Sequence, residues 1–260
     1  MNSRNIQLVF NPPFATIKLN RPEKRNAISY ELIADLLGAL EEVAASSARV
    51  MILTGEGQAF CSGMDLDDLK GLIGRSPDQN LEDSKTMAQL FRAVYEFPKP
   101  TIAAVNGAAI AGGACLATLC DFTLAAAEAK FGYTEVRIGF LPAIVSTFLL
   151  RQVGEKRARE LLLTGKIIGT EEAFRMGLIN EIVPAGSLLS RAEELARQLA
   201  ENSPASLTAT KRLLRDLTRT ELDNQIAIAV QANAAIRATK DFREGISSFL
   251  EKRKPNWSGK

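Results

Sequence analysis

Short apolar runs alternate with amphipathic helical segments between residues 6 and 200 of the chain. The helical period is clearest after Ser29, a candidate helix cap, where six apolar residues share one face: Leu32, Ile33, Leu36, Leu37, Leu40 and Val43. Strands are predicted from the short apolar runs at 6–10, 14–19, 50–54, 101–105, 122–125 and 179–183. Strands that alternate with helices in this way predict an α/β fold.

The predicted helices become more frequent toward the end of the chain. Within the core they are predicted at 81–97, 155–163 and 188–200. Everything beyond Ser203 is expected to be helical, including 205–217 and 222–238. We therefore place a domain boundary near residue 200, which separates an α/β core at 1–200 from a helical region at 201–260. The segment 74–80 is expected to be loose, because it is rich in glycine, proline and polar residues.

The charges of the chain are nearly balanced, with 32 basic and 30 acidic residues and a formal net charge of +2. This balance does not predict a nucleic-acid or membrane surface. The alanine-rich stretch at 101–127 is interrupted by Asn106 and Asp121, so a buried core is a better interpretation than a membrane span. No secretory pattern opens the sequence, and a cytoplasmic location is expected.

The sequence contains no histidine. This excludes Ser-His-Asp and Cys-His catalysis and any histidine-based zinc site. Cys61, Cys115 and Cys120 lack metal-ligand spacing, so we expect free thiols and no metal. Acid–base chemistry must therefore be carried out by Asp, Glu, Lys, Tyr or Cys side chains.

Two glycine-containing stretches, at 57–66 and 106–114, follow predicted strands. Glycine lets the backbone approach a ligand closely, and a helix that begins at Gly112 would direct unpaired N–H groups toward that ligand. The simpler interpretation of each stretch is a tightly packed loop. A dinucleotide-binding loop is not favoured, because Gly55-Glu56-Gly57 lacks the third glycine and the helix that should follow it.

In order and spacing, four segments of the sequence resemble the signatures of the enoyl-CoA hydratase/isomerase (crotonase) family. They are Leu19-Asn20-Arg21-Pro22-Glu23-Lys24-Arg25-Asn26-Ala27-Ile28, Ala59-Phe60-Cys61-Ser62-Gly63-Met64-Asp65-Leu66, Lys99-Pro100-Thr101 through Asn106-Gly107 to Gly112-Gly113, and Cys120-Asp121 followed by Ala129 to Glu135. The resemblance implies a spiral of strand–strand–helix (ββα) turns followed by a helical trimerisation region. It also implies a homotrimer or a dimer of trimers.

The same resemblance assigns the candidate site. The backbone N–H groups of Met64 and Gly112 would stabilise the oxyanion of a thioester, and Glu135 would transfer the proton. Substrate contacts are implied for Lys24, Arg25, Ala27, Ser62, Asp65, Leu66, Cys115, Phe140, Phe249 and Lys252. Without the resemblance, Glu135 would be taken for a surface glutamate and the lysines for solvated charges. Coenzyme A (CoA) enters as part of an acyl-CoA substrate, and no separate cofactor is implied.

The sequence departs from the family pattern at Cys115, where hydratases of the family have a first glutamate. A thiol is a poor general base at neutral pH, because its ordinary pKa is near 8.5. A single carboxylate suits a shift of an enoyl double bond between the 3 and 2 positions better than the addition of water. Hydration and isomerisation both stay open, and the alternative class is a non-catalytic CoA-binding or RNA-binding scaffold of the same fold.

Apolar side chains that could line the acyl pocket are Leu66, Leu69, Leu72, Ile73, Phe91 and Phe140, although such residues more often belong to a core. Asp121 is interpreted as structural, and Asp65 as a residue that also shapes its loop.

Overall fold

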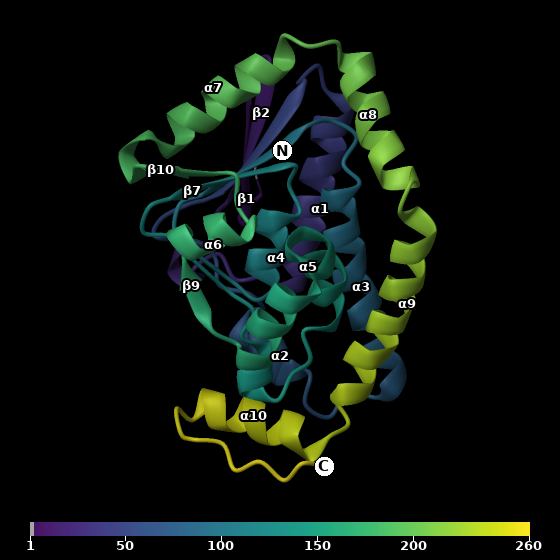
Figure 1. The fold of residues 1–260 in the computed structure, drawn as a ribbon. Coiled ribbons are helices and arrows are strands. Elements are labelled where there is room, and N and C mark those ends of the chain that lie inside the picture. Colours follow the sequence, from purple (N-terminus) through teal and green to yellow (C-terminus); the bar gives the residue numbers. More distant parts are fainter. Residues whose placement is uncertain (1–2) are drawn as a thin grey trace.

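The computed structural model describes residues 3–260, and its main sheet has six strands (Figure 1). Their spatial order is β1 (Ile6–Asn11), β2 (Phe14–Leu19), β3 (Val50–Gly55), β5 (Thr101–Val105), β7 (Phe122–Ala126) and β10 (Glu181–Val183). The β1–β2 pair is antiparallel, and every later pairing in this sheet is parallel. All six strands were predicted from the sequence, with boundaries that differ by up to two residues.

A second sheet of four short strands was not predicted. It contains β4 (Ala59–Cys61), β6 (Ala108–Ile110), β8 (Lys130–Gly132) and β9 (Ile167–Gly169). The first three of these strands each follow a strand of the main sheet, and a helix then leads the chain to the next turn. This repeat produces the expected spiral of strand–strand–helix turns. Strands of three residues are too short to show a period of two, which is why the sequence indicated loops at β4 and β6 and no strand at β8 and β9.

The helices cover both faces of the main sheet and extend beyond it (Figure 1). They are α1 (Tyr30–Ala45), α2 (Leu66–Gly71), α3 (Pro77–Tyr95), α4 (Gly112–Thr118), α5 (Ala143–Thr164), α6 (Thr170–Met176), α7 (Leu188–Ala200), α8 (Pro204–Asp216), α9 (Arg219–Ile236) and α10 (Lys240–Leu250). Short 3-10 helices lie at Pro22–Lys24, Glu135–Ile138 and Ala185–Ser187. No helix within residues 3–260 is long and apolar enough to cross a membrane.

Alternation along β3 explains how the sheet acquires two apolar faces. Val50 and Ile52 belong to a cluster with the small residues of α7, whereas Met51 and Leu53 belong to the main core, which includes the buried face of α1. Successive side chains of a strand point to opposite faces, so a fully apolar strand such as β3 must be covered on both sides. The structure provides that cover with α7 on one face and the remaining core on the other.

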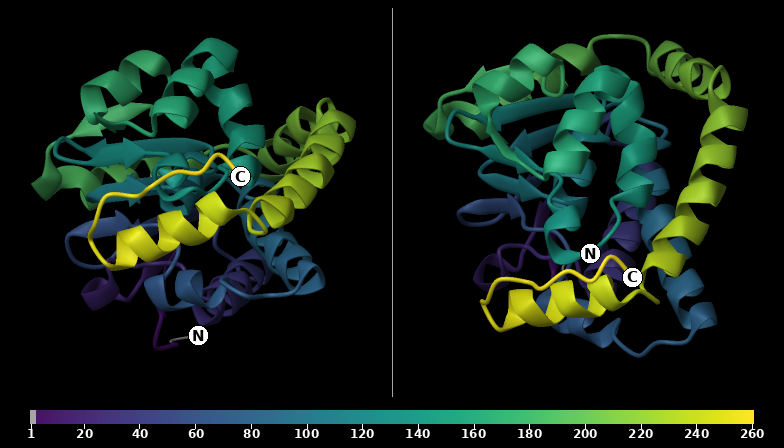
Figure 2. Two further views of the ribbon diagram at one scale, coloured as in Figure 1. Left: turned by 90° about the horizontal axis from the view of Figure 1, so that it is seen from below. Right: turned by 60° about the horizontal axis from the view of Figure 1, so that its bottom comes forward.

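Two local expectations were wrong. The segment 74–80 is not loose throughout, because α3 already begins at Pro77. Ser76 and Gln79 form a reciprocal capping box, and proline is well suited to the first turn of a helix. The chain beyond Ser203 is not entirely helical either, since residues after Leu250 leave α10 and run back along it (Figure 2).

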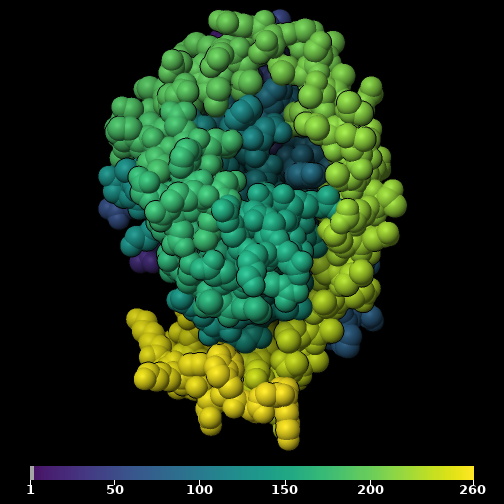
Figure 3. All heavy atoms as spheres, in the orientation of Figure 1, coloured from purple at the N-terminus to yellow at the C-terminus, as the bar shows by residue number. Residues whose placement is uncertain are grey.

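The C-terminal helices extend from the core as an arm that returns to it. Helix α8 buries none of its own side chains, although Lys211 reaches back to Asp121 with a 2.5 Å ion pair. Figure 3 shows a hollow between this arm and α7. Helix α9 packs on α3 and α5, and α10 lies against α2 and the 3-10 helix at Glu135–Ile138. The domain boundary near residue 200 stays a prediction.

Asp121 has the structural role expected for it. Its Oδ2 accepts hydrogen bonds from the backbone N–H of Thr101 at 2.8 Å and from the Thr101 hydroxyl at 3.0 Å. Together with Lys211, these contacts join β5 to the start of β7 and to α8.

A substitution at Gly113 tests whether α4 must lie as close to β4 as the structure shows. A Cβ at this position would lie 2.1 Å from the backbone oxygen of Cys61, which no side-chain rotation can relieve. We expect Gly113→Ala to lower the free energy of unfolding by about 3 kcal/mol or more, measured by urea denaturation. Gly186→Ala is the matched control, because nothing lies within 4 Å of the added carbon. Equal urea midpoints for the two variants would contradict the close approach.

Candidate active site

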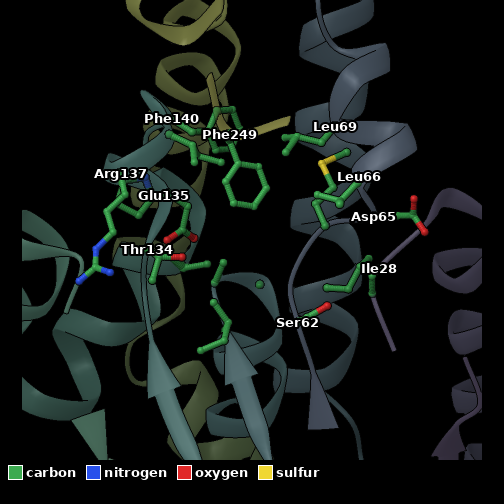
Figure 4. A pocket seen from close by; sticks show the side chains of 18 of the residues that line it. Ile28, Ser62, Asp65, Leu66, Leu69, Thr134, Glu135, Arg137, Phe140 and Phe249 are labelled. Carbon is green, nitrogen blue, oxygen red and sulfur yellow. The ribbon is translucent and has the colours of Figure 1, made fainter. Parts of the chain in front are cut away.

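A cavity of about 930 Å³ lies between the two glycine stretches, the Glu135 segment and the C-terminal helices. Every residue of the predicted site lines it except Cys115: Lys24, Arg25, Ala27, Ser62, Met64, Asp65, Leu66, Gly112, Glu135, Phe140, Phe249 and Lys252. Figure 4 shows Glu135 and Phe140 on one side of the cavity and Leu66 and Leu69 on the other. The tertiary structure thus brings four separate stretches of sequence to one place.

The two glycine stretches lie directly against each other. A Cβ on Gly63, where φ is +90°, would lie 3.1 Å from the Ile110 oxygen and 3.2 Å from the Ala111 side chain. Ile28 contacts both glycine stretches. It forms a parallel bridge with Met64, and its Cδ1 lies 3.2 Å from where a Cβ of Gly112 would be. The backbones of Met64 and Gly112 therefore both lie beside Ile28.

Neither the Met64 nor the Gly112 N–H donates a hydrogen bond to any group within residues 3–260. Ile28 bonds on either side of Met64, donating to the Gly63 oxygen at 2.7 Å and accepting from the Asp65 N–H at 2.8 Å. Gly112 is the first residue of α4, where a helix leaves its N–H groups unpaired. Two free backbone donors thus line the same cavity, as an oxyanion site requires.

Glu135 begins a 3-10 helix and is only 7% exposed. Its Oε2 is buried without a hydrogen-bond partner in the described part of the chain. Burial raises the pKa of Glu135 from its ordinary value of 4.5 to about 7, because water no longer stabilises the charged form. Arg137 does not counteract this effect by pairing with Glu135, since Figure 4 shows it directed away. A carboxyl group in this setting can both accept and return a proton near neutral pH.

Cys115 lies in α4 inside the main core and is not among the residues that line the cavity, so its predicted contact with substrate stays a prediction. Burial, followed by the nearby Glu135 charge, raises the pKa of the Cys115 thiol well above its ordinary value. The thiol therefore stays protonated at neutral pH. It cannot replace a carboxylate as a base.

One edge of the cavity carries charged residues whose contacts are mostly within the protein. Arg21 donates to Asp65 at 2.8 Å and to the Ala27 oxygen at 2.6 Å, and Asp65 also caps α2. Lys24 pairs with Asp67 at 3.0 Å, and both side chains are largely exposed. Asp65 therefore holds the loop in place, and Lys24 is accessible from solvent at the mouth of the cavity.

Aromatic residues of the Glu135 segment and of α10 close the other edge. Phe140 packs on Phe242 of α10 with ring centroids 5.5 Å apart. Phe249 is 48% exposed, and its ring occupies the centre of the view in Figure 4. Phe140, Phe249 and Lys252 line the cavity of their own chain. The C-terminal helix therefore contributes to the site without a second copy.

The sequence analysis missed a polar group in this cavity, made of Asp83 from α3 and Asn233 and Arg237 from the α9 region. Polar residues within helical patterns normally face solvent, so the sequence offered no signal that these were buried. Leu72 and Ile73, suggested as acyl-pocket residues, do not line the cavity. Leu72 packs instead in a small cluster with Leu69 and α10.

Residues 3–260 contain no cluster of three or more acidic or cysteine side chains placed to hold a metal ion.

Comparison with known proteins identifies relatives along nearly the whole chain. The family model for enoyl-CoA hydratase/isomerase matches residues 10–260. A Thermus thermophilus protein named "Putative enoyl-CoA hydratase" is 46% identical over 94% of this chain and 96% of its own. Two Escherichia coli proteins are each 36% identical over 94% of this chain: 2,3-dehydroadipyl-CoA hydratase, covered over 94% of its length, and 1,2-epoxyphenylacetyl-CoA isomerase, covered over 95%.

Among solved structures, an enoyl-CoA hydratase/isomerase from Xanthobacter autotrophicus Py2 superimposes with a TM-score of 0.88. It is 29% identical and is matched over 96% of this chain and 97% of its own. The spiral architecture is therefore shared with that structure.

The buried carboxyl group predicts how stability depends on pH. The folded state holds the Glu135 proton up to about pH 7, whereas the unfolded state releases it near 4.5. The wild type should therefore lose stability as pH rises through this window, by up to about 3 kcal/mol. Glu135→Gln cannot ionise and should not lose this stability.

Urea denaturation of wild type and Glu135→Gln between pH 4 and 8 measures this effect. We expect the variant to gain stability relative to wild type as pH rises. The exposed Glu128→Gln is the control for the loss of one carboxyl group. A stability difference between wild type and Glu135→Gln that does not change with pH would show that Glu135 titrates normally.

Proposed function

Because the chain belongs to the enoyl-CoA hydratase/isomerase family, we propose that it acts on an enoyl-CoA thioester and transfers one proton through Glu135. The observation that carries this proposal is the pairing of one buried carboxyl group with two unpaired backbone N–H groups in a single cavity. That combination provides a proton acceptor and a site for negative charge. An enolate-forming reaction needs both.

The thioester oxygen would accept hydrogen bonds from the N–H groups of Met64 and Gly112. Loss of a proton from the acyl chain moves negative charge onto this oxygen. Donors already fixed by the backbone then stabilise the enolate without reorganising, an effect typically worth about 3–4 kcal/mol for each donor. The Met64 side chain has no chemical role in this step, and it lines the acyl cavity.

The proposed reaction is a double-bond shift from the 3 to the 2 position. Ionised Glu135 takes a proton from C2 of a 3-enoyl-CoA, and the electron pair spreads over the thioester and the double bond. The protonated Glu135 then returns the same proton at C4, which gives the 2-enoyl product. A pKa of about 7 favours this sequence, since neither protonation state of Glu135 is strongly disfavoured at neutral pH.

Hydration is less favoured, because water would need a second group to orient and activate it. The position where hydratases of the family have this group is occupied by Cys115, whose thiol is buried in the core and remains protonated. A single carboxyl group would then have to deprotonate water and also supply the proton to C2. The proposal therefore assigns the isomerase branch of the family chemistry to this chain.

CoA itself would bind at the charged mouth of the cavity. Lys24, Arg25 and Lys252 line this region and provide cationic donors suited to phosphate groups. Lys24 already pairs with Asp67, so phosphate would compete with an exposed carboxylate there. Solvent weakens that existing pair, which makes the exchange possible.

We further propose that the chain assembles as a homotrimer or a dimer of trimers through its C-terminal arm. Helix α8 buries no side chain, yet Leu213, Leu214 and Leu217 on or next to it are at least 60% exposed. Such a leucine-rich surface is typical of a protein–protein contact. A second copy of the same chain would cover it.

Glu135→Gln tests the proton-transfer role. The amide keeps the shape of the side chain but cannot accept a proton, so turnover should fall by roughly a hundredfold or more. Affinity for a saturated acyl-CoA, measured by calorimetry, should stay close to that of wild type. Undiminished turnover would place the proton-transfer group elsewhere, and the Glu128→Gln control should keep full activity.

Cys115→Glu tests why hydration is disfavoured. A second carboxyl group beside Glu135 should raise hydration of crotonyl-CoA relative to the double-bond shift, because two groups can divide the handling of water and proton. The decay of enoyl-thioester absorbance and chromatography of the products measure both reactions. Cys115→Gln matches the added volume without a charge. Equal hydration by the two variants would contradict the proposal.

A further inference from the structure

The far end of the cavity is polar, unlike the walls that lead to it. Met87, Phe91, Leu141 and Ile144 line the walls, whereas Asp83, Asn233 and Arg237 lie together at the end. All three polar residues are at least nine-tenths buried. A cavity that held only an alkyl chain would gain nothing from a buried ion pair, because burying charges costs free energy.

Helix geometry places this polar end away from the oxyanion donors. Phe91 lies beside Gly112, since its Cζ is 3.3 Å from where a Cβ of Gly112 would be. Asp83 precedes Phe91 by two helical turns on the same face of α3, which corresponds to a rise of roughly 12 Å. A thioester bound at Gly112 would therefore direct the far end of its acyl group toward Asp83 and Arg237.

Arg237, at the end of α9, and Asp83, in α3, form an ion pair. The Arg237 Nη2 lies 2.5 Å from Asp83 Oδ2 and 2.8 Å from Asn233 Oδ1. Asp83 is shared, because its Oδ1 also accepts from the Tyr30 hydroxyl and from Arg75. Two arginines therefore depend on one carboxylate.

The Arg237 guanidinium has more N–H donors than the acceptor atoms that surround it. Its Nε is buried and donates to no group in the described part of the chain, and Nη1 makes only a 3.4 Å contact with Asn80. The guanidinium also packs over the Phe140 ring, 5.4 Å from its centroid. A buried donor without a partner costs free energy, which a ligand oxygen can recover.

We propose that Arg237 selects acyl groups that carry a hydrogen-bond-accepting oxygen, a carboxylate or a carbonyl, at the end remote from the thioester. This inference rests on the proposed function and specifies its substrate class. The apolar walls hold the middle of the acyl group, and the Nη1 group of Arg237, whose one contact with Asn80 is long, donates to its polar end. A methyl-terminated chain of the same length offers that group no acceptor.

The wild-type enzyme provides the first test, which needs no variant. 3-Enoyl-CoA substrates with six and eight acyl carbons are compared in three forms, which end in a methyl group, a methyl ketone or a carboxylate. We expect kcat/KM to be about tenfold or more higher for a polar-ended form than for the methyl-ended form. If only the carboxylate form is preferred over the methyl form, the site selects an anion. If the ketone and carboxylate forms are preferred equally, a neutral hydrogen-bond acceptor is sufficient. A preference for the methyl-ended form at both lengths overturns the proposal.

Two variants attribute the preference to Arg237. Arg237→Lys keeps a charge beside Asp83 but removes the guanidinium donors, and it should reduce the preference for polar-ended substrates severalfold, mainly through KM. The double variant Arg237→Met with Asp83→Leu removes both charges of this pair, and Arg75, which also loses its carboxylate, is partly exposed to solvent. This double variant should prefer the methyl-ended form. Polar-end selectivity that persists in both variants would assign these residues a structural role only.

Arg92→Met is the matched control. Arg92 and Asp223 form another ion pair between α3 and α9, but it is partly exposed and does not line the cavity. This variant should keep the wild-type substrate preference. A shift equal to that of Arg237→Lys would mean that loosening the two helices, and not the lost donors, changes selectivity.

Binding of saturated acyl-CoA thioesters separates this inference from the proposed reaction. Calorimetry with hexanoyl-CoA and with the corresponding ω-carboxylate measures the preference without any chemical step. Tighter binding of the polar-ended form by a protein that converts no enoyl-CoA would support Arg237 and contradict the proposed reaction. Turnover of enoyl-CoA by a protein that binds hexanoyl-CoA more tightly than the ω-carboxylate would support the proposed reaction and contradict the role of Arg237.

Discussion

The close approach of backbones between the two turns that carry β4 and β6 is the constraint on which the site depends. A Cβ at Gly107 would lie 2.1 Å from the Gln58 oxygen, and one at Gly113 equally close to the Cys61 oxygen. Only glycine allows this packing. Because the two turns are held together there, Met64 and Gly112 both line the cavity beside Ile28. Side chains are not needed to build this part of the site.

Burial of Glu135 raises the pKa of its carboxyl group and reduces the stability of the folded protein at neutral pH. The same loss of water that raises the pKa to about 7 makes the ionised form unfavourable in the folded protein. Its Oε2 has no partner within residues 3–260, so no hydrogen bond offsets that cost. Functional sites commonly trade stability for reactivity in this way. A glutamate with good partners would be more stable and less able to exchange a proton at neutral pH.

The C-terminal helices decide what the cavity can hold. Helix α10 closes it with Phe249, and the end of α9 supplies Arg237 at the remote end. The two ends therefore have different chemistry. In the proposed function, one end would bind the thioester and transfer a proton, and the other would contact the tail of the acyl group. The arm formed by α8 carries the exposed leucines through which we propose that a second copy of the chain binds.

The sequence by itself determined the α/β class and the six strands of the main sheet. Through its resemblance to a family, it also predicted that Glu135 and the two glycine stretches belong to one site. These features are local, since buried strands, capped helices and motif spacing can all be read along the chain. Only the tertiary structure decided that Cys115 lies in the core outside the cavity, and that Asp83 and Arg237 meet at its far end. A polar residue in a helix gives no local sign of its burial, because its surroundings come from segments distant in the sequence.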